Sequence, residues 1–189
     1  MKTIWLNFRP TLGWLAVAAI LVLPVLTLPG AVDIFLKIDD VKGESLDDKH
    51  KDEIDVLAWS WGLNNSGTTH VEGGEGKSSV KDLSITKWID KSTPALMLAT
   101  LTGKPFGNAL LTVRKAGGKE ALEYIKIEMK DILVTSTATG GSGGQDRLTE
   151  NVTLNFASFR LTYTPQKRDG SADTPVAVEW NIVRNRPEF

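Results

Sequence analysis

The segment YIKIEMK at residues 124–130 shows most clearly how this chain folds. Apolar and charged residues alternate strictly along it, with Ile125, Ile127 and Met129 set against Lys126, Glu128 and Lys130. Successive side chains of a β-strand point to opposite faces, so a period of two places all three apolar residues on one face. The segment therefore predicts a strand with one buried side and one side that faces solvent.

The same alternation continues along most of the chain. Strands are predicted before this segment at 31–38, 54–63, 80–89 and 108–115, and after it at 151–164 and 176–182. Within 151–164 the apolar phase changes between Phe156 and Phe159, which predicts a bulge or bend near Ala157-Ser158. Many strands separated by turn signals favour an antiparallel barrel or sandwich.

In three of these strands the alternation also assigns individual side chains to one face or the other. In 31–38 the pattern places Ile34, Leu36 and Ile38 on one side, and Phe35 on the other side with the polar residues Asp33 and Lys37. In 54–63, Trp59 and Trp61 share the core face, and Ser60 takes the other. The last strand carries an apolar stripe of Val176, Val178, Trp180 and Ile182. The polar stretch between the first two strands, residues 39–53, is predicted to be a solvated loop.

One segment has the signals of a helix. Ser92 or Thr93 is a suitable N-cap, Pro94 fits the first turn, residues 95–101 are mainly helix formers and Gly103 ends the run. The predicted fold class is therefore mainly β: an antiparallel β-barrel of two sheets with one short flanking α-helix. A single domain at 31–189 is long enough to bury its own core.

Residues 1–30 differ from the rest of the chain. Lys2 and Arg9 precede an uncharged run, which is the layout of a signal peptide. Cleavage after residue 30 or 31 would lack the small residue wanted three positions back, and Pro24 interrupts the run as a membrane span. We expect a signal- or anchor-like extension or a coding start assigned too far upstream. Membrane contact is expected only if residues 1–30 are retained.

Charge and composition exclude several classes of partner. Two of the 22 basic residues lie in 1–30, so residues 31–189 carry 20 basic and 23 acidic residues, a net charge of −3. Nucleic acid is not expected as a partner, because phosphate binding needs clustered Lys and Arg. The chain has no cysteine. Its two histidines, His50 and His70, lie in separate polar stretches and are expected on the surface rather than in a metal site.

Two glycine-containing stretches resemble nucleotide-binding motifs, but each lacks a glycine that the motif requires. Gly76-Lys77-Ser78 matches the end of a P-loop, but the required upstream glycine is Val71 and a strand, not a helix, is predicted next. The run 140–144 would need a further glycine where Asp146 stands. No nucleophile elbow or catalytic triad pattern occurs. We therefore expect that the chain is not an enzyme and that it binds neither a cofactor nor a metal ion.

A set of ordered motifs spans residues 31–189. They are AVDIFLKI at 31–38, VKGES at 41–45, EIDVLAWSWG at 53–62, DKSTP at 90–94, RKAGG at 114–118, TGGSGG at 139–144, ENVTLNF at 150–156 and WNI at 180–182. In this order they resemble the haemolysin-coregulated protein (Hcp) family, the tube subunit of the bacterial type VI secretion system. Residues 1–30 depart from it, because family members normally begin with Met where this chain has Gly30.

The resemblance implies a barrel that forms hexameric rings, which stack into a tube inside a sheath, carry a spike at the tip and hold effector proteins in the ring lumen. It implies assembly in the cytoplasm followed by secretion. It makes Ser60 a candidate for contact with effectors. It also makes two long loops candidates for ring or stacking contacts, through Gly73, Gly74, Glu75, Gly76, Lys77, Gly140, Gly141, Ser142, Gly143, Gly144, Asp146 and Arg147.

One alternative rests on the N-terminal segment alone. A membrane-tethered or periplasmic β-barrel that binds a small ligand would have the same strand pattern, with residues 1–30 as its signal or anchor. It predicts a monomer, whereas the tube subunit predicts a ring of six.

Overall fold

A computed structural model of the chain describes residues 32–66, 78–115, 120–144 and 146–189. The predictions that concern residues 1–30, His70 and Gly73 to Lys77 lie outside these residues. The elements are β1 (Asp33–Ile38), β2 (Ile54–Ser60), β3 (Leu63–Asn65), β4 (Ser78–Val80), β5 (Leu83–Trp88), α1 (Thr93–Thr102), β6 (Phe106–Lys115), β7 (Leu122–Thr139), β8 (Thr149–Tyr163) and β9 (Val176–Asn181).

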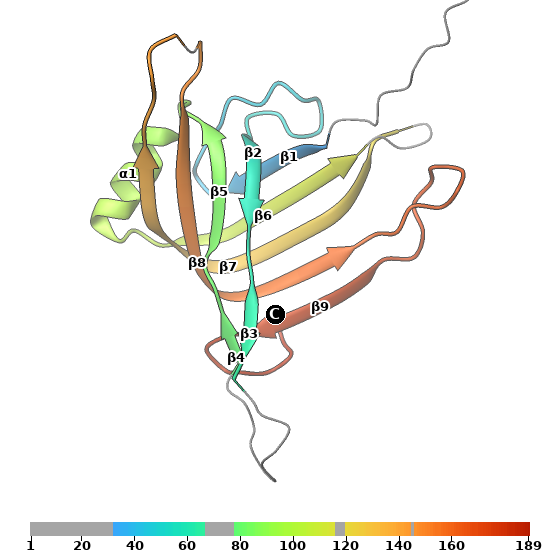
Figure 1. The fold of residues 1–189 in the computed structure, drawn as a ribbon. Coiled ribbons are helices and arrows are strands. Elements are labelled where there is room, and N and C mark those ends of the chain that lie inside the picture. The colour runs from blue at the N-terminus through green and yellow to red at the C-terminus, as the bar shows by residue number, and fades with distance from the viewer. Residues whose placement is uncertain (1–31, 67–77, 116–119, 145) are drawn as a thin grey trace, which may run out of the picture.

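The fold is a closed antiparallel barrel. Seven strands form one sheet in the order β5-β2-β1-β6-β7-β8-β9, and β5 also pairs with β8, which closes six of them into a barrel (Figure 1). β3 and β4 form a second, two-stranded sheet that continues β2 and β5. The predicted mainly β fold with two sheets and one helix is therefore confirmed.

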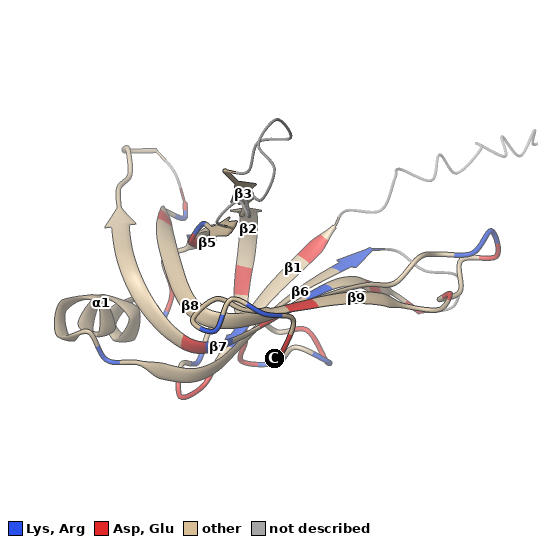
Figure 2. Ribbon diagram, turned by 90° about the horizontal axis from the view of Figure 1, so that it is seen from below, with Lys and Arg blue, Asp and Glu red and all other residues tan. Residues whose placement is uncertain are grey.

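Strands β7 and β8 are long because each serves two parts of the sheet. The first part of β8, from Thr149 to Leu154, pairs with β5 and closes the barrel, whereas Ser158 to Tyr163 pairs with β9. The predicted bend lies between them. Ser158 and Phe159 are both buried, and Asp131 of β7, opposite Ala157, has a positive φ of 53°. Beyond the bend β9 extends the sheet away from the barrel (Figure 2).

We call this extension the wing. It consists of β9 and the adjoining parts of β6, β7 and β8, which are residues 111–115, 122–128 and 160–163. Strand β9 occurs where it was predicted, but its outer residues Val176 and Val178 are 61% and 54% exposed. The predicted apolar stripe is therefore open to solvent at this end, because no described segment packs over that end of the sheet.

The helix α1 forms as its sequence signals predict. Ser92 is the N-cap, Pro94 lies in the first turn and Gly103 ends the helix in the left-handed conformation, with its N–H donating to Ala99 O. Leu96 and Ala99 are buried against the barrel, where the helix packs on β7.

The structure divides one predicted strand. Residues 80–89 form β4 and β5 with a break at Lys81-Asp82. Lys81 O accepts a hydrogen bond from the indole of Trp61, and the carboxylate of Asp82 accepts hydrogen bonds from Thr135 and Asn155. The Lys81 carbonyl and the Asp82 carboxylate therefore have hydrogen-bond partners, although the strand pairing is interrupted at these two residues.

Candidate functional site

Strand β2 carries the residue predicted to face a ring lumen. Trp59 and Trp61 pack against the core as predicted, and Trp61 lies edge-on to Phe159 at 4.7 Å between ring centroids. Ser60 is exposed and pairs in register with Ser84 of β5. Its position on the outer surface of the barrel follows from the alternation, because both neighbouring indoles point inward.

The loop between β7 and β8 is an exposed tip at one end of the barrel. Gly140, Gly141, Ser142, Gly143, Gly144, Asp146 and Arg147 are all exposed. The guanidinium of Arg147 lies 4.8 Å from the Trp88 ring and fixes the base of the tip. In Figure 1 the tip rises above the barrel, whereas the β3–β4 hairpin projects from the opposite end.

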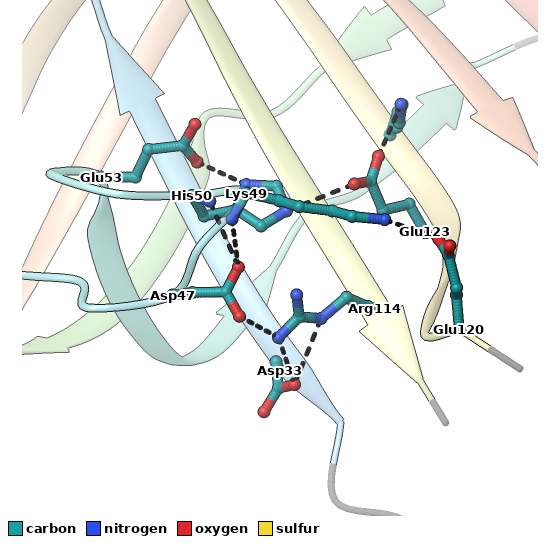
Figure 3. Close-up of polar contacts among 9 residues, drawn as sticks. Asp33, Asp47, Lys49, His50, Glu53, Arg114, Glu120 and Glu123 are labelled. Atoms are coloured by element: carbon teal, nitrogen blue, oxygen red, sulfur yellow. Dashed lines mark hydrogen bonds and ion pairs between the residues drawn. The ribbon is translucent and has the colours of Figure 1, made fainter. Parts of the chain in front are cut away.

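A charged cluster fastens the 39–53 loop to the outer side of the sheet (Figure 3). Arg114 of β6 donates hydrogen bonds to Asp47 of the loop and to Asp33 of β1. The hydrogen bond from Arg114 lowers the pKa of Asp47 from 3.8 to about 2, against a smaller opposing effect of burial. The same two carboxylates raise the pKa of Arg114, with Asp47 the stronger partner.

His50 is the centre of the second half of this cluster. Its Nδ1 lies 2.9 Å from Glu53 and its Nε2 lies 3.4 Å from Glu123 (Figure 3). Its ring stacks on Phe35 at 4.1 Å. Burial raises the pKa of Glu123, but Lys126 and the positive charges nearby outweigh it, so that pKa is lowered.

Two predictions made from the sequence are corrected here. His50 was expected at the surface and is 6% exposed, and Phe35, assigned to the polar face, is equally buried. Both corrections have one cause: the 39–53 loop folds back over β1. Gly43 permits the two ends of this loop to lie close together, because a Cβ at that position would lie 2.1 Å from Glu53 O.

A third cluster is buried between β5, β8 and α1. Lys87 Nζ lies 2.6 Å from Glu150 Oε1 and 2.8 Å from Asp90 Oδ1, with all three side chains almost fully buried. Thr93 of α1 also donates to Glu150, at 2.7 Å. Sequence reasoning missed this cluster, although Lys87 continues the inward phase of Leu83 and Ile85.

These clusters join parts of the fold, the 39–53 loop to β1 and β6 in one case and α1 to β8 in the other. Among the described residues, no group of three or more His, Cys, Asp or Glu side chains is arranged to hold a metal ion. No helix in the described ranges is long and apolar enough to cross a membrane. The described residues define a class of protein, a small closed β-barrel with exposed residues at the tip, on β2 and on the wing.

Comparison with known proteins gives the particular family. A family model described as type VI secretion system effector, Hcp, matches residues 35–163. The chain is 60% identical over 158 residues to Protein hcp1 of Pseudomonas aeruginosa, covering 82% of this chain and 98% of that protein.

Solved structures of similar fold come from the same family. A structure titled as a type six secretion system protein has a TM-score of 0.78 at 30% identity, covering 84% of this chain and all of that one. Hcp1 from Salmonella typhimurium has a TM-score of 0.69 at 34% identity, covering 84% and 99% of the two chains. The chain belongs to the Hcp family of type VI secretion proteins, which are secreted tube proteins known to form hexameric rings.

Proposed function

We propose that this chain builds the inner tube of a type VI secretion system by stacking hexameric rings, and that the lumen of each ring carries effector proteins. The rings assemble in the cytoplasm inside a sheath, carry a spike at the tip of the tube and are then secreted. Membership of the Hcp family supports this proposal most directly. The match covers 98% of the Pseudomonas aeruginosa relative and all of the first solved structure, so almost nothing of these relatives is missing from this chain.

The two ends of the barrel support stacking. The exposed tip formed by Gly140 to Gly144, Asp146 and Arg147 lies at one end, and the β3–β4 hairpin lies at the other (Figure 1). Head-to-tail stacking requires two different surfaces at opposite ends of the subunit, since each ring presents one to the ring above and the other to the ring below. Gly73 to Lys77, the other residues that we propose for ring or stacking contacts, lie outside the described residues.

The position of Ser60 supports a lumen that accepts varied cargo. It is exposed and small, and it lies on a strand held rigidly to the core by the tryptophans on either side. Repeated around a ring, a small polar residue leaves space and imposes no charge on the cargo. A larger side chain at this position would narrow the lumen at every subunit without entering the barrel core.

Co-purification of an effector from the source organism tests this proposal. Ser60→Gln should reduce the amount of effector that co-purifies, while the mass of the ring and the melting temperature stay unchanged. Ser60→Ala is the matched control and should retain the effector, because it adds no bulk. Unchanged retention in Ser60→Gln would contradict a lumen role for Ser60, and loss of the ring would place this residue in a subunit interface.

A further inference from the structure

The apolar face of the sheet continues from the barrel core onto the wing. Register pairs residues across five strands in three apolar rows: Ile38, Ala109, Met129, Phe159 and Trp180; Leu36, Leu111, Ile127, Leu161 and Val178; and Ile34, Val113, Ile125, Tyr163 and Val176. Residues opposite one another across antiparallel strands share a face. All three rows therefore belong to one continuous apolar surface.

Exposure along these rows rises toward β9. Leu111 and Ile127 are fully buried, whereas Val178 in the same row is 54% exposed. In the outermost row Tyr163 is 41% and Val176 61% exposed. The core is thus complete on the barrel side and open on the wing side.

The opposite face of the same strands has a different character. Glu128, Arg160 and Glu179 are register partners there, and Arg160 forms a 2.8 Å ion pair with Glu179. One face of the wing is therefore suited to water, and the other presents contiguous apolar side chains. Contiguous exposed apolar surface on a soluble chain marks an interaction site.

The second uncovered apolar surface is the outer side of α1. Met97, Leu98 and Leu101 are 36%, 61% and 84% exposed, and no residue from Thr93 to Thr102 is charged. Figure 2 shows α1 without charge along its length and on the other side of the barrel from β9. An uncharged helix face is the element that covers an apolar sheet face in layered folds.

We infer that the outer side of α1 in one copy packs on the apolar face of the wing in the next copy, through Leu98 and Leu101 against Tyr163, Val176 and Val178. This inference rests on the proposed ring. Two different patches on opposite sides of a subunit make a heterologous contact, which repeats around a ring until it closes. Each subunit then completes the core of its neighbour.

Crosslinking of introduced cysteines tests this contact directly, because the chain has no cysteine of its own. The full chain is prepared as Leu101→Cys, as Val178→Cys and as the double variant, and each is treated with a short bismaleimide crosslinker. The double variant should give a ladder of linked chains that ends at six on a denaturing gel. Each single variant should stay unlinked, since a heterologous contact never brings a residue against its own copy.

Charge substitutions give a second readout. Leu98→Asp and Val178→Asp should each raise the concentration at which the ring dissociates by about tenfold or more. Leu46→Asp is the matched control, because Leu46 is 93% exposed and lies outside both patches, and it should leave the ring intact. The melting temperature of the dissociated chain should change little in all three variants.

The outcomes separate the inference from the proposed function. An unmodified chain that is monomeric contradicts the ring itself. A wild-type ring that persists in both Asp variants, with no ladder from the double Cys variant, overturns the α1–wing contact and leaves the ring standing. Crosslinking of a single Cys variant to itself, or protection of the Val178→Cys thiol in the dissociated chain, also overturns it, since either assigns the wing another occupant.

Discussion

The barrel and the wing are built from the same strands and differ in whether their core is finished. In the barrel, β5 closes on β8 and α1 covers one side, so Leu83, Leu154 and Ile132 are fully buried. In the wing, the same alternation leaves Val176 and Val178 in solvent. The barrel thus supplies stability to a single chain, and the wing supplies a surface whose burial depends on another chain.

The largest effect is expected in the closed part, at the buried ion cluster. Lys87→Met leaves Glu150 and Asp90 buried without their cation, and removing one partner of such a pair costs about 3–5 kcal/mol. We expect a loss of this size in the free energy of unfolding from urea titration. Lys51→Met, at an exposed position, is the matched control and should change little.

A second substitution checks whether charge or packing dominates at Lys87. The double variant Lys87→Met with Glu150→Met should recover part of the lost stability, because only Asp90 then lacks its cation. Wild-type stability in Lys87→Met alone would show that the cluster does not hold α1 to the barrel.

Equivalent truncations in the two regions sharpen the comparison. Leu154→Ala should cost about 2–5 kcal/mol of unfolding free energy, because the side chain is fully buried in the barrel. Val178→Ala should cost below about 1 kcal/mol in the dissociated chain, because that side chain is half exposed, and should weaken the ring instead. Urea titration below the dissociation concentration measures both. Equal losses at the two positions would mean that the wing is covered within one chain.

The effect expected at the loop cluster is smaller than that at the buried ion cluster and depends on pH. The pKa of Asp47 is about 2 in the folded chain against an ordinary value of 3.8, so ionised Asp47 stabilises the fold above pH 3.8. This contribution is lost as pH falls from 3.8 through about 2.

Asp47→Asn should therefore be less stable than the wild type at neutral pH, and the two should converge toward pH 2. Asp33→Asn is the control and should show a smaller difference, since Asp33 is 49% exposed against 22% for Asp47. Thermal unfolding over a pH series measures both differences. A gap between wild type and Asp47→Asn that is constant or widens at low pH would contradict the role of the Arg114 contact.

Sequence periodicity predicted the strands, the helix and the bend in β8, because these depend on local alternation and capping. It also assigned the apolar residues of the wing to one face. It could not predict that this face stays uncovered, since coverage depends on which segments meet in space. The burial of His50 and Phe35 was missed for the same reason, because a polar composition does not reveal that a loop folds back over a strand.

Some of these features did have a local signal. Lys87 and Glu150 each stand in phase with apolar neighbours, Lys87 after Ile85 and Glu150 before Val152. A charged residue in a core phase requires a buried partner of opposite charge. The sequence pattern alone therefore predicts that Lys87 and Glu150 form a pair, without knowledge of the register between β5 and β8.

The mass of the unmodified chain in solution tests the central claim most directly. If the wing is completed by a neighbouring copy, light scattering coupled to size exclusion should give six times the subunit mass at tens of micromolar chain. A monomer under these conditions would contradict the claim, because the apolar face of the wing would then be stable in water without a partner.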